Sequence, residues 1–353
     1  MLVRLEAEDF RNLERLSCDF DGGSHLFLGN NGAGKTSLLE AVYLLATTRS
    51  FRTPRVSDCC RHGAASFRLS AEVEDDRRVR LDLGWCGGER WRTVNDQRGS
   101  LAEHLAVLPV VCWSSGDVEI LVGPPALRRQ LLDRGLVGLK PAVISVISRY
   151  RRIVEEKRQL LLRGGGEIDT WNRLLAEAAA DLIRLRSAHL ERLRAALEEV
   201  LAAADLGFPQ VAMRYRCSPR CGLEGADAIE NKLASVSRRE RRRQQLLIGP
   251  HRDEVAVTWD GHEIRQVASA GERKALGLAL LAAQGRVLEA AGRRPAYLLD
   301  DADAELDGGR LESLWRVFGG CGQLFATSSR PPIWETVDVD HRWRLEAGGL
   351  TAS

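Results

Sequence analysis

Residues 29 to 36 read Gly29-Asn30-Asn31-Gly32-Ala33-Gly34-Lys35-Thr36, followed by Ser37. The stretch fits the pattern G-x-x-x-x-G-K-[ST], in which glycines let the backbone wrap a phosphate chain without Cβ clashes. Successive N–H groups and the start of a following helix then face the anion. In this chemistry Lys35 reaches the β- and γ-phosphates and Thr36 offers its hydroxyl to Mg²⁺. We therefore predict that residues 29–37 bind ATP; a glycine-rich turn without a ligand is the alternative.

A second group of residues able to hold a metal ion follows the apolar run at 296–299. Asp300 stands at the carboxyl end of a predicted buried strand, the edge at which α/β sheets bind ligands. We expect Asp300 to complete the Mg²⁺ shell with Thr36, and Asp301 to orient an attacking water. Lys35, Asp300 and Asp301 are the predicted catalytic residues. A plain exit from a strand into a loop is the other interpretation of the two acids.

The third motif is Ser269-Ala270-Gly271-Glu272, which opens a predicted helix over 272–290. It resembles the S-G-G-Q signature of ABC-type ATPases, which contacts the γ-phosphate held by the other subunit of a dimer. A helix start carrying Ser and Gly suits an anion. A serine helix cap without any ligand is the alternative. The position about 30 residues before the strand that ends at Asp300 favours the signature interpretation.

These motifs need elements to position them. An apolar run at 24–29 predicts a strand before the loop, and helical spacing at 36–48 predicts a helix after it. From Ala126 to about Ala204 the chain is charged and helical in period, with a break at 164–166, so a helical hairpin inserted into an α/β domain is expected. Further strands are expected at 2–10, 67–74, 78–85, 106–112, 211–215, 254–259, 296–300 and 323–327.

Composition narrows the class of protein. The chain has 353 residues and a formal net charge of +2, which does not by itself indicate a nucleic-acid binder. Lysine contributes only five of the 51 basic residues, and the arginine excess fits either phosphate recognition or a coding bias. No apolar window long enough for a membrane span and no signal peptide is evident, so a cytoplasmic protein with reduced thiols is expected. The Cys59-Cys60 pair and Cys217 with Cys221 suggest zinc only weakly, because no second pair lies at ligand spacing.

Basic clusters are the candidates for DNA contact. The densest run surrounds residues 238–243, and other arginines lie on the predicted helical insertion. Either phosphate binding or an ordinary solvated helix face with i,i+4 ion pairs explains them. The candidates are Arg128, Arg129, Arg151, Arg152, Arg238, Arg239, Arg241, Arg242 and Arg243. His251, which follows a Gly-Pro turn, is interpreted as structural.

Taken together, these motifs resemble the RecF family, which belongs to the SMC-like ABC ATPases. The resemblance extends over almost the whole chain. Its most particular elements are the arginine pair at 128–129 and the Gly-Pro-His-Arg-Asp block at 249–253. The other matching segments are Phe10-Arg11-Asn12-Leu13, residues 31–41, Ser50-Phe51-Arg52-Thr53, Leu132-Asp133, Leu298-Leu299-Asp300-Asp301 and Glu305-Leu306-Asp307.

Several positions depart from the family pattern. Trp113-Ser114-Ser115-Gly116-Asp117 replaces a Phe-x-Pro-Glu-Asp stretch, so a metal contact there cannot be assigned. Ala304 stands in the D-loop where a serine is usual, and Glu272 stands where the signature often has glutamine. After 322–327 no histidine occurs until His341, so the histidine of an H-switch is missing from its usual place.

The resemblance implies an ATP-controlled dimer that clamps DNA near single-strand–duplex junctions and reopens on slow hydrolysis. It also implies a role in recombinational repair of gaps and stalled forks, in which the protein helps RecO and RecR to load RecA, and support of SOS induction. The expected domains are residues 1–122 and 206–353 as an ATPase head and residues 123–205 as a helical arm. An SMC-type DNA-bridging head and a transporter-type ATPase are the rival classes. The short arm disfavours the first. The second usually needs an H-switch histidine and a Q-loop glutamine, and no glutamine lies between residues 98 and 129.

Overall fold

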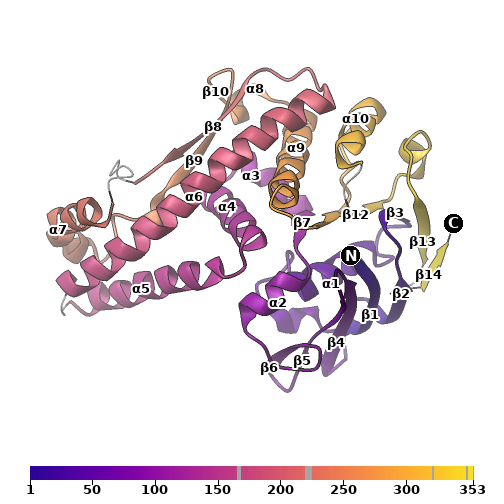
Figure 1. Cartoon of the computed structure of the whole chain (residues 1–353), viewed down its shortest axis with the longest axis horizontal. Helices are drawn as coiled ribbons and strands as arrows, with labels where there is room; N and C mark the ends of the chain where they lie inside the picture. The colour runs from indigo at the N-terminus through magenta and orange to yellow at the C-terminus, as the bar shows by residue number, and fades with distance from the viewer. Residues whose placement is uncertain (165–167, 219–224, 320–321, 347–348, 353) are drawn as a thin grey trace. The chain divides into compact units, whose positions relative to one another are not determined.

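The computed structural model describes residues 1–164, 168–218, 225–319, 322–346 and 349–352. Contacts divide the chain into two compact units, each assembled from separate segments (Figure 1). Unit 1 comprises Met1–Val118, Ala196–Gly207 and Ser269–Ser353, and unit 2 comprises Glu119–Ala195 and Phe208–Ala268. No helix in the described ranges has an apolar stretch long enough to cross a membrane.

Unit 1 contains a five-stranded antiparallel sheet in the order β2-β1-β4-β5-β6. Buried and exposed residues alternate along β2, as expected for a sheet that packs on one face. The strands are β1 (Leu2–Phe10), β2 (Leu13–Asp19), β4 (Ser66–Glu74), β5 (Arg78–Cys86) and β6 (Glu89–Val94).

A second, six-stranded sheet of unit 1 has the order β14-β13-β3-β12-β11-β7. Its five strands from β13 to β7 run parallel, and only β14 is antiparallel to its neighbour. Parallel neighbours bring the carboxyl ends of β3, β12 and β11 to one edge of the sheet. The strands are β3 (Gly23–Leu28), β7 (Val110–Trp113), β11 (Ala296–Leu299), β12 (Gln323–Ser328), β13 (His341–Glu346) and β14 (Gly349–Ala352).

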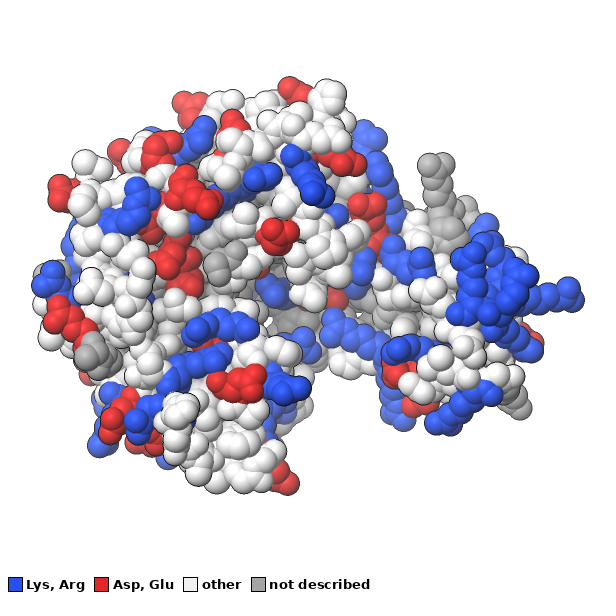
Figure 2. Space-filling view, turned by 180° about the vertical axis from the view of Figure 1, so that it is seen from behind, with Lys and Arg blue, Asp and Glu red and all other residues white. Residues whose placement is uncertain are grey.

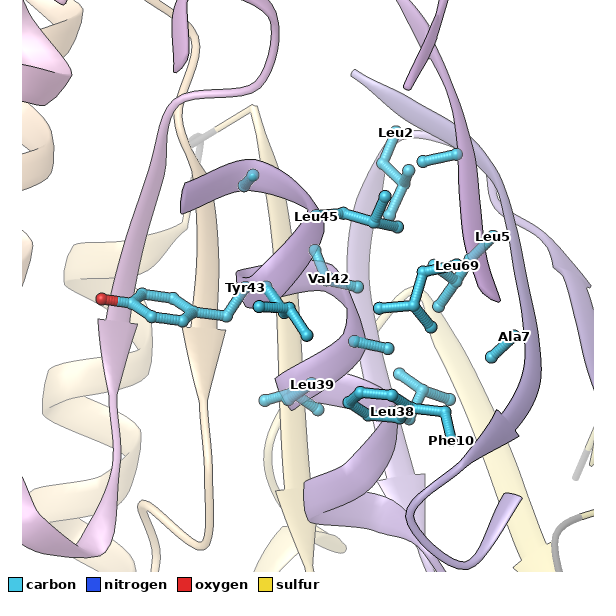
Figure 3. Close-up of a cluster of buried hydrophobic side chains, with 14 of the residues drawn as sticks. Leu2, Leu5, Ala7, Phe10, Leu38, Leu39, Val42, Tyr43, Leu45 and Leu69 are labelled. Atoms are coloured by element: carbon cyan, nitrogen blue, oxygen red, sulfur yellow. The ribbon is translucent and has the colours of Figure 1, made fainter. Parts of the chain in front are cut away.

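Helix α1 (Lys35–Thr47) contacts both sheets of unit 1, which explains why nearly all of its side chains are buried. Figure 3 shows Leu38, Val42 and Leu45 facing the strand residues Leu2, Phe10 and Leu69, while Tyr43 points in the opposite direction. This packing holds the start of α1, and the loop before it, between two layers of the core. The other helices of unit 1 are α2 (Leu101–Val107), α9 (Ala270–Glu289) and α10 (Gly308–Phe318).

Unit 2 is mainly helical, with a small antiparallel sheet in the order β10-β9-β8. Helix α5 ends at Gly164, which has a φ of 73°, and α5 and α6 lie antiparallel to each other (Figure 1). Its elements are α3 (Glu119–Val122), α4 (Pro125–Leu139), α5 (Val143–Arg163), the first part of α6 (Ile168–Ala204), α7 (Ala226–Arg243), α8 (Ile264–Val267), β8 (Val211–Arg216), β9 (Glu254–Trp259) and β10 (His262–Glu263).

The observed units differ from the expected division at three places. Residues 119–122, expected in the head, belong to unit 2, and residues 196–205, expected in the arm, belong to unit 1. Residues 208–268, expected in the head, group with the helical insertion because β9 packs on α4 and α7 packs on α5. The strand expected at 106–112 is also partly wrong. A capping box at Ser100 and Glu103 starts α2, which runs to Val107, so the strand begins only at Val110. The other expected strands and the helices at 36–48 and 272–290 are found within two residues of their predicted bounds.

Candidate functional site

The glycine-rich loop connects the end of β3 at Leu28 to the start of α1 at Lys35. Gly32 and Gly34 have φ angles of 83° and 111°, a region in which a side chain would be strained. The loop is closed by the Ala33 amide, which donates to the Asn30 carbonyl at 3.2 Å. The loop therefore leads directly into the N-terminus of α1, where the helix dipole favours an anion.

The Lys35 ammonium lies inside this loop rather than in solvent. It donates to the carbonyls of Gly29 at 2.7 Å and Asn30 at 3.0 Å, and the side chain is almost fully buried. A buried ammonium held by backbone oxygens is a fixed positive charge at the centre of the loop. Such a charge suits the polyphosphate of a nucleotide.

The turn between β1 and β2 supports the loop from outside, a role that the sequence patterns did not reveal. The Asn12 amide donates to the Gly32 carbonyl at 2.8 Å and accepts the Ser37 hydroxyl at 2.7 Å. Arg11 has a positive φ of 57° and forms a bidentate ion pair with the fully buried Glu40 of α1, at 2.9 and 2.6 Å. The Phe10–Leu13 motif thus holds the nucleotide loop to the antiparallel sheet.

Asp300 and Thr36 are 264 positions apart in the sequence and adjacent in the structure. The Thr36 hydroxyl donates to Asp300 Oδ1 at 2.9 Å, and the Thr327 hydroxyl donates to the same oxygen at 2.9 Å. Burial raises the pKa of Asp300, while the two hydroxyl hydrogen bonds oppose that rise. The carboxylate therefore lies beside the loop at the shared edge of β3, β11 and β12.

Asp301 follows with a positive φ of 44°, which is uncommon for a residue other than glycine. Its amide donates to the Thr327 hydroxyl at 2.9 Å. Its Oδ1 atom is buried and has no hydrogen-bond partner in the described part of the chain. Burial raises the pKa of Asp301, whereas the charge of Lys35 lowers it. The strained turn therefore fixes a half-buried carboxyl next to Lys35.

The oxygen donors present suit a magnesium ion. Mg²⁺ prefers oxygen ligands and is often held by one or two protein groups together with substrate phosphates and water. The Thr36 hydroxyl and the Asp300 carboxylate are such groups, and they meet directly beside the loop. Elsewhere in the described ranges, no three His, Cys, Asp or Glu side chains gather to hold a metal. Cys221, one of the residues considered for zinc, lies outside the described residues.

Ser269 caps helix α9, and its side-chain hydrogen bonds are local. Its hydroxyl and amide both contact Glu272 Oε2, at 2.7 and 2.8 Å, which completes a capping box. Ser269 and Ala270 are exposed. Among the described residues, Ser269 makes no hydrogen bond to the glycine-rich loop or to Asp300. The structure therefore joins the loop with Asp300 in one chain but leaves the Ser269 motif facing outward.

The arginine candidates separate into buried and exposed groups. The buried Arg128 guanidinium donates to the carbonyls of Val255 at 2.7 Å, Gly123 at 2.9 Å and Ile120 at 3.0 Å. These donors join α4 to β9 and the preceding turn, which disfavours Arg128 as a phosphate contact. Arg129 is also partly buried and donates to the Asp253 carbonyl at 2.7 Å.

The arginines on the long helices are more open. Arg151 and Arg152 are both exposed, and Arg151 pairs with Asp133 at 3.3 Å. The five arginines of α7 are all exposed, and none of their guanidinium groups has an ion pair or hydrogen bond within the described ranges; they are Arg238, Arg239, Arg241, Arg242 and Arg243. Figure 2 shows a dense group of basic side chains over this helix. The α7 arginines thus form an unneutralised positive surface.

The Gly249–Asp253 block is structural. The Tyr150 hydroxyl lies 2.6 Å from His251 Nδ1, and the Tyr215 hydroxyl donates to Asp253 at 2.6 Å. Arg186 donates to the Pro250 carbonyl at 2.9 Å. These contacts tie the block to α5, α6 and β8, which agrees with the structural interpretation of His251.

The segment that departs from the family pattern also has local contacts. The Ser114 amide and hydroxyl both donate to Asp117 Oδ2 at 2.7 Å, so this carboxylate stabilises its own turn. The Trp113 carbonyl accepts the Asp300 amide at 3.0 Å, which places the turn beside β11. Ala304 donates its amide to the Asp301 carbonyl at 3.2 Å.

Comparisons with known proteins agree with this geometry. A family profile described as an AAA domain matches residues 4–159. The chain is 34% identical to the DNA replication and repair protein RecF of Acidothermus cellulolyticus, over 93% of each chain. It is 33% identical to the protein of the same name from Geotalea daltonii, over 98% of each chain.

Solved structures are similar over the whole chain. A structure titled as the recombination mediator protein RecF-ATP in the RecFOR pathway matches with a TM-score of 0.89 and 25% identity, covering 100% of this chain and 97% of that one. An Smc head bound to a domain of ScpA matches with a TM-score of 0.61 and 16% identity, covering 100% and 96%. The second likeness concerns the fold alone.

Proposed function

Because the chain belongs to the RecF family of DNA replication and repair proteins, we propose that ATP closes two copies of it into a clamp on DNA and that slow hydrolysis reopens the clamp. The family resemblance and the α/β fold of an ABC-type ATPase, both expected from the sequence, are confirmed. The observation that carries the proposal is the contact between Thr36 and Asp300, which joins a phosphate-binding loop to a metal-binding carboxylate.

Residues Gly29 to Ser37 bind the nucleotide in this proposal. One structural neighbour is named as a RecF-ATP structure, and the loop of this chain holds the Lys35 ammonium at the position where a nucleotide phosphate needs a positive charge. Thr36 and Asp300 hold Mg²⁺, which supplies charge stabilisation to the phosphates. Asp301 orients the attacking water, since its buried Oδ1 has no other partner in the described chain.

Dimer formation completes the site in trans. Ser269, Ala270, Gly271 and Glu272 face the γ-phosphate of the partner copy, where the N-terminus of α9 adds its dipole. The exposure of Ser269 and Ala270 in the single chain supports this division. Each nucleotide then lies between the loop of one copy and the helix start of the other.

DNA binds to positive surfaces of the chain, of which the α7 arginines are the clearest. Exposed guanidinium groups without acidic partners are available to phosphates, and releasing counterions makes such binding salt-dependent. Arg152 is exposed and belongs to the same proposal, and Arg151 contributes more weakly because it pairs with Asp133. Arg128 is excluded from it and Arg129 is disfavoured, because backbone carbonyls already occupy their donors.

The cellular role follows from the family. We expect a cytoplasmic protein that recognises gapped or junction DNA during recombinational repair and at stalled replication forks. RecO and RecR are the expected partners, and through them the chain helps to load RecA and supports SOS induction.

Sedimentation with ATP, ADP or no nucleotide, each with and without gapped DNA, tests the clamp. We expect a dimer with ATP only, and Lys35→Met should abolish it and reduce hydrolysis by at least about 100-fold. Nucleotide-dependent dimerisation that survives Lys35→Met would overturn the site assignment. Circular dichroism of the variant checks that the fold is intact.

Mixed dimers test the shared site. Ser269→Ala and Ser269→Arg should bind ATP but dimerise poorly, whereas Asp300→Asn should lose Mg²⁺ binding and hydrolysis. Mixing a Ser269 variant with Asp300→Asn restores one intact composite site, so partial activity should return. Unchanged dimerisation and hydrolysis in both Ser269 variants would mean that this motif is only a helix cap.

The DNA surface has a matched control within unit 2. Arg158, Arg184 and Arg194 are also exposed, but each pairs with an acid three residues earlier. Replacing the five α7 arginines with glutamine should reduce the slope of log affinity against log salt by about 0.9 for each phosphate that is no longer neutralised. The same change at the three paired arginines should leave the slope nearly unchanged. Equal effects in both sets would contradict a specific α7 surface.

A further inference from the structure

The start of helix α9 lies directly against the segment that carries Asp301. The Lys274 ammonium donates to the Asp301 carbonyl at 3.0 Å. One turn earlier, a Cβ added to Gly271 would lie 3.2 Å from the Glu305 carbonyl, so the two backbones approach closely there. Two contacts therefore join the N-terminal end of α9, which carries residues 269–272, to residues 301–305.

The segment held in this way has a strained backbone. Asp301 and Glu305 both have positive φ angles, of 44° and 65°, although neither is a glycine. Such conformations persist only where the surroundings hold them in place. For Asp301 the holding groups are visible: Thr327 accepts its amide hydrogen, and both Lys274 and the Ala304 amide donate to its carbonyl. The two peptide groups of Asp301 are thus fixed from two sides.

The surroundings of Lys274 direct its ammonium towards the backbone of Asp301. It is almost fully buried, and the acidic groups nearest to its ammonium belong to Glu305, Asp303 and Asp301. The Asp303 carboxylate already accepts the Ser328 hydroxyl at 2.8 Å. Within the described part of the chain, the buried ammonium directs its hydrogen bond to the Asp301 backbone, so its position depends on the position of that turn.

We propose that Lys274 is a positioning residue that couples the two nucleotide sites of the dimer. It transmits engagement of Ser269 with the partner's γ-phosphate to the Asp301 turn of its own subunit. The inference rests on the proposed function, because it requires the signature motif to act in trans. Binding of nucleotide in one site then adjusts the carboxyl that acts on the nucleotide in the other.

The two nucleotide sites of the dimer should respond differently to the loss of Lys274. The signature motif serves the partner's nucleotide, but Lys274 contacts Asp301, which serves its own subunit's nucleotide. Loss of the Lys274 ammonium should therefore slow hydrolysis in cis. If Lys274 only stabilised helix α9, its loss should instead slow hydrolysis of the nucleotide bound to the partner subunit.

Mixed dimers purified through two different tags distinguish these outcomes. One subunit carries Asp301→Asn, so only the other subunit's nucleotide can be hydrolysed. Lys274→Met placed in the hydrolysing subunit should reduce its rate by roughly 10- to 100-fold, the scale expected for a displaced catalytic group. The same change in the Asp301→Asn subunit should leave the rate within about twofold. The opposite pattern, or equal rates in both arrangements, would overturn the proposal.

Controls separate failure of the inference from failure of the proposed function. Wild-type protein that neither dimerises with ATP nor hydrolyses it contradicts the proposed function itself. Lys274→Arg keeps a donor and should restore part of the rate, and a lower Hill coefficient for ATP in the Lys274→Met homodimer should accompany the loss. Gly271→Ala should also weaken the coupling, whereas Gly308→Ala should not, since a Cβ at Gly308 meets no atom within 4 Å.

Discussion

Removing one charge of the buried ion pair between α5 and α7 should loosen α7. Lys157 Nζ lies 2.6 Å from Glu240 Oε2, and neither side chain is exposed. The other carboxylate oxygen accepts the Leu247 amide at 2.7 Å. Burial lowers the pKa of Lys157, and the Glu240 carboxylate opposes that shift. The pair is therefore desolvated, and each charge depends on the other.

Lys157→Met keeps most of the apolar side chain but leaves the Glu240 carboxylate with one backbone donor. An unpaired buried charge costs about 3–5 kcal/mol, so the free energy for opening α7 should fall by that amount. In Lys157→Met/Glu240→Met both charges are gone, and the main loss is the Leu247 N–H partner, about 1–3 kcal/mol. The double variant should therefore be more stable than Lys157→Met.

Native-state amide hydrogen exchange on α7 is the suitable assay, because the two compact units need not unfold together. The exchange of α1 amides serves as the internal control and should not change. The reasoning is refuted if Lys157→Met lowers the opening free energy by less than about 1 kcal/mol, or if the double variant opens more readily than the single one.

Three other perturbations test separate parts of the fold and site. Burial, then nearby positive charges, lower the pKa of His251 from 6.5 to about 4. As the pH falls, His251 binds a proton in the unfolded chain before it does so in the folded chain. The free energy of unfolding should therefore decrease by roughly 3 kcal/mol between pH 6.5 and pH 4. Urea unfolding of His251→Gln should lack this decrease. Gly285→Ala places a methyl group against the Tyr297 hydroxyl, so calorimetry should show a loss of about 1–3 kcal/mol. Thr327→Val removes the hydroxyl that donates to Asp300, so hydrolysis should fall about 10- to 100-fold while ATP affinity, measured by calorimetric titration, changes little.

The nucleotide loop could be predicted from the sequence because its information is local. Gly32 and Gly34 need positive φ angles, and Lys35 begins the helix that follows, so eight consecutive residues specify the loop. The strand and helix around it are equally local, since apolar spacing determines which face is buried. The helix cap at Ser269 could be predicted for the same reason. The local sequence did not decide whether Ser269 is only a cap or also a signature motif.

The arginines show the limit of such inference. Arg128 and Arg241 both lie next to other arginines, and the local sequence does not show which of the two is buried. The fold buries Arg128 among backbone carbonyls and leaves Arg241 exposed on α7. Burial depends on how α4 packs against β9, more than 120 positions later, and no local pattern encodes that distance.

The residues of the candidate site could be predicted from the sequence, but the hydrogen bonds that join distant segments there could not. Thr36 and Asp300 were expected to share one Mg²⁺, but their direct hydrogen bond exists because β3 and β11 flank β12 among the parallel strands of one sheet, an order unrelated to chain order. The bond of Lys274 to the Asp301 carbonyl and the support of the loop by Asn12 are of the same kind. Sequence patterns specify which groups are present and which local conformations they adopt, whereas hydrogen bonds between distant segments require packing that only the folded chain provides.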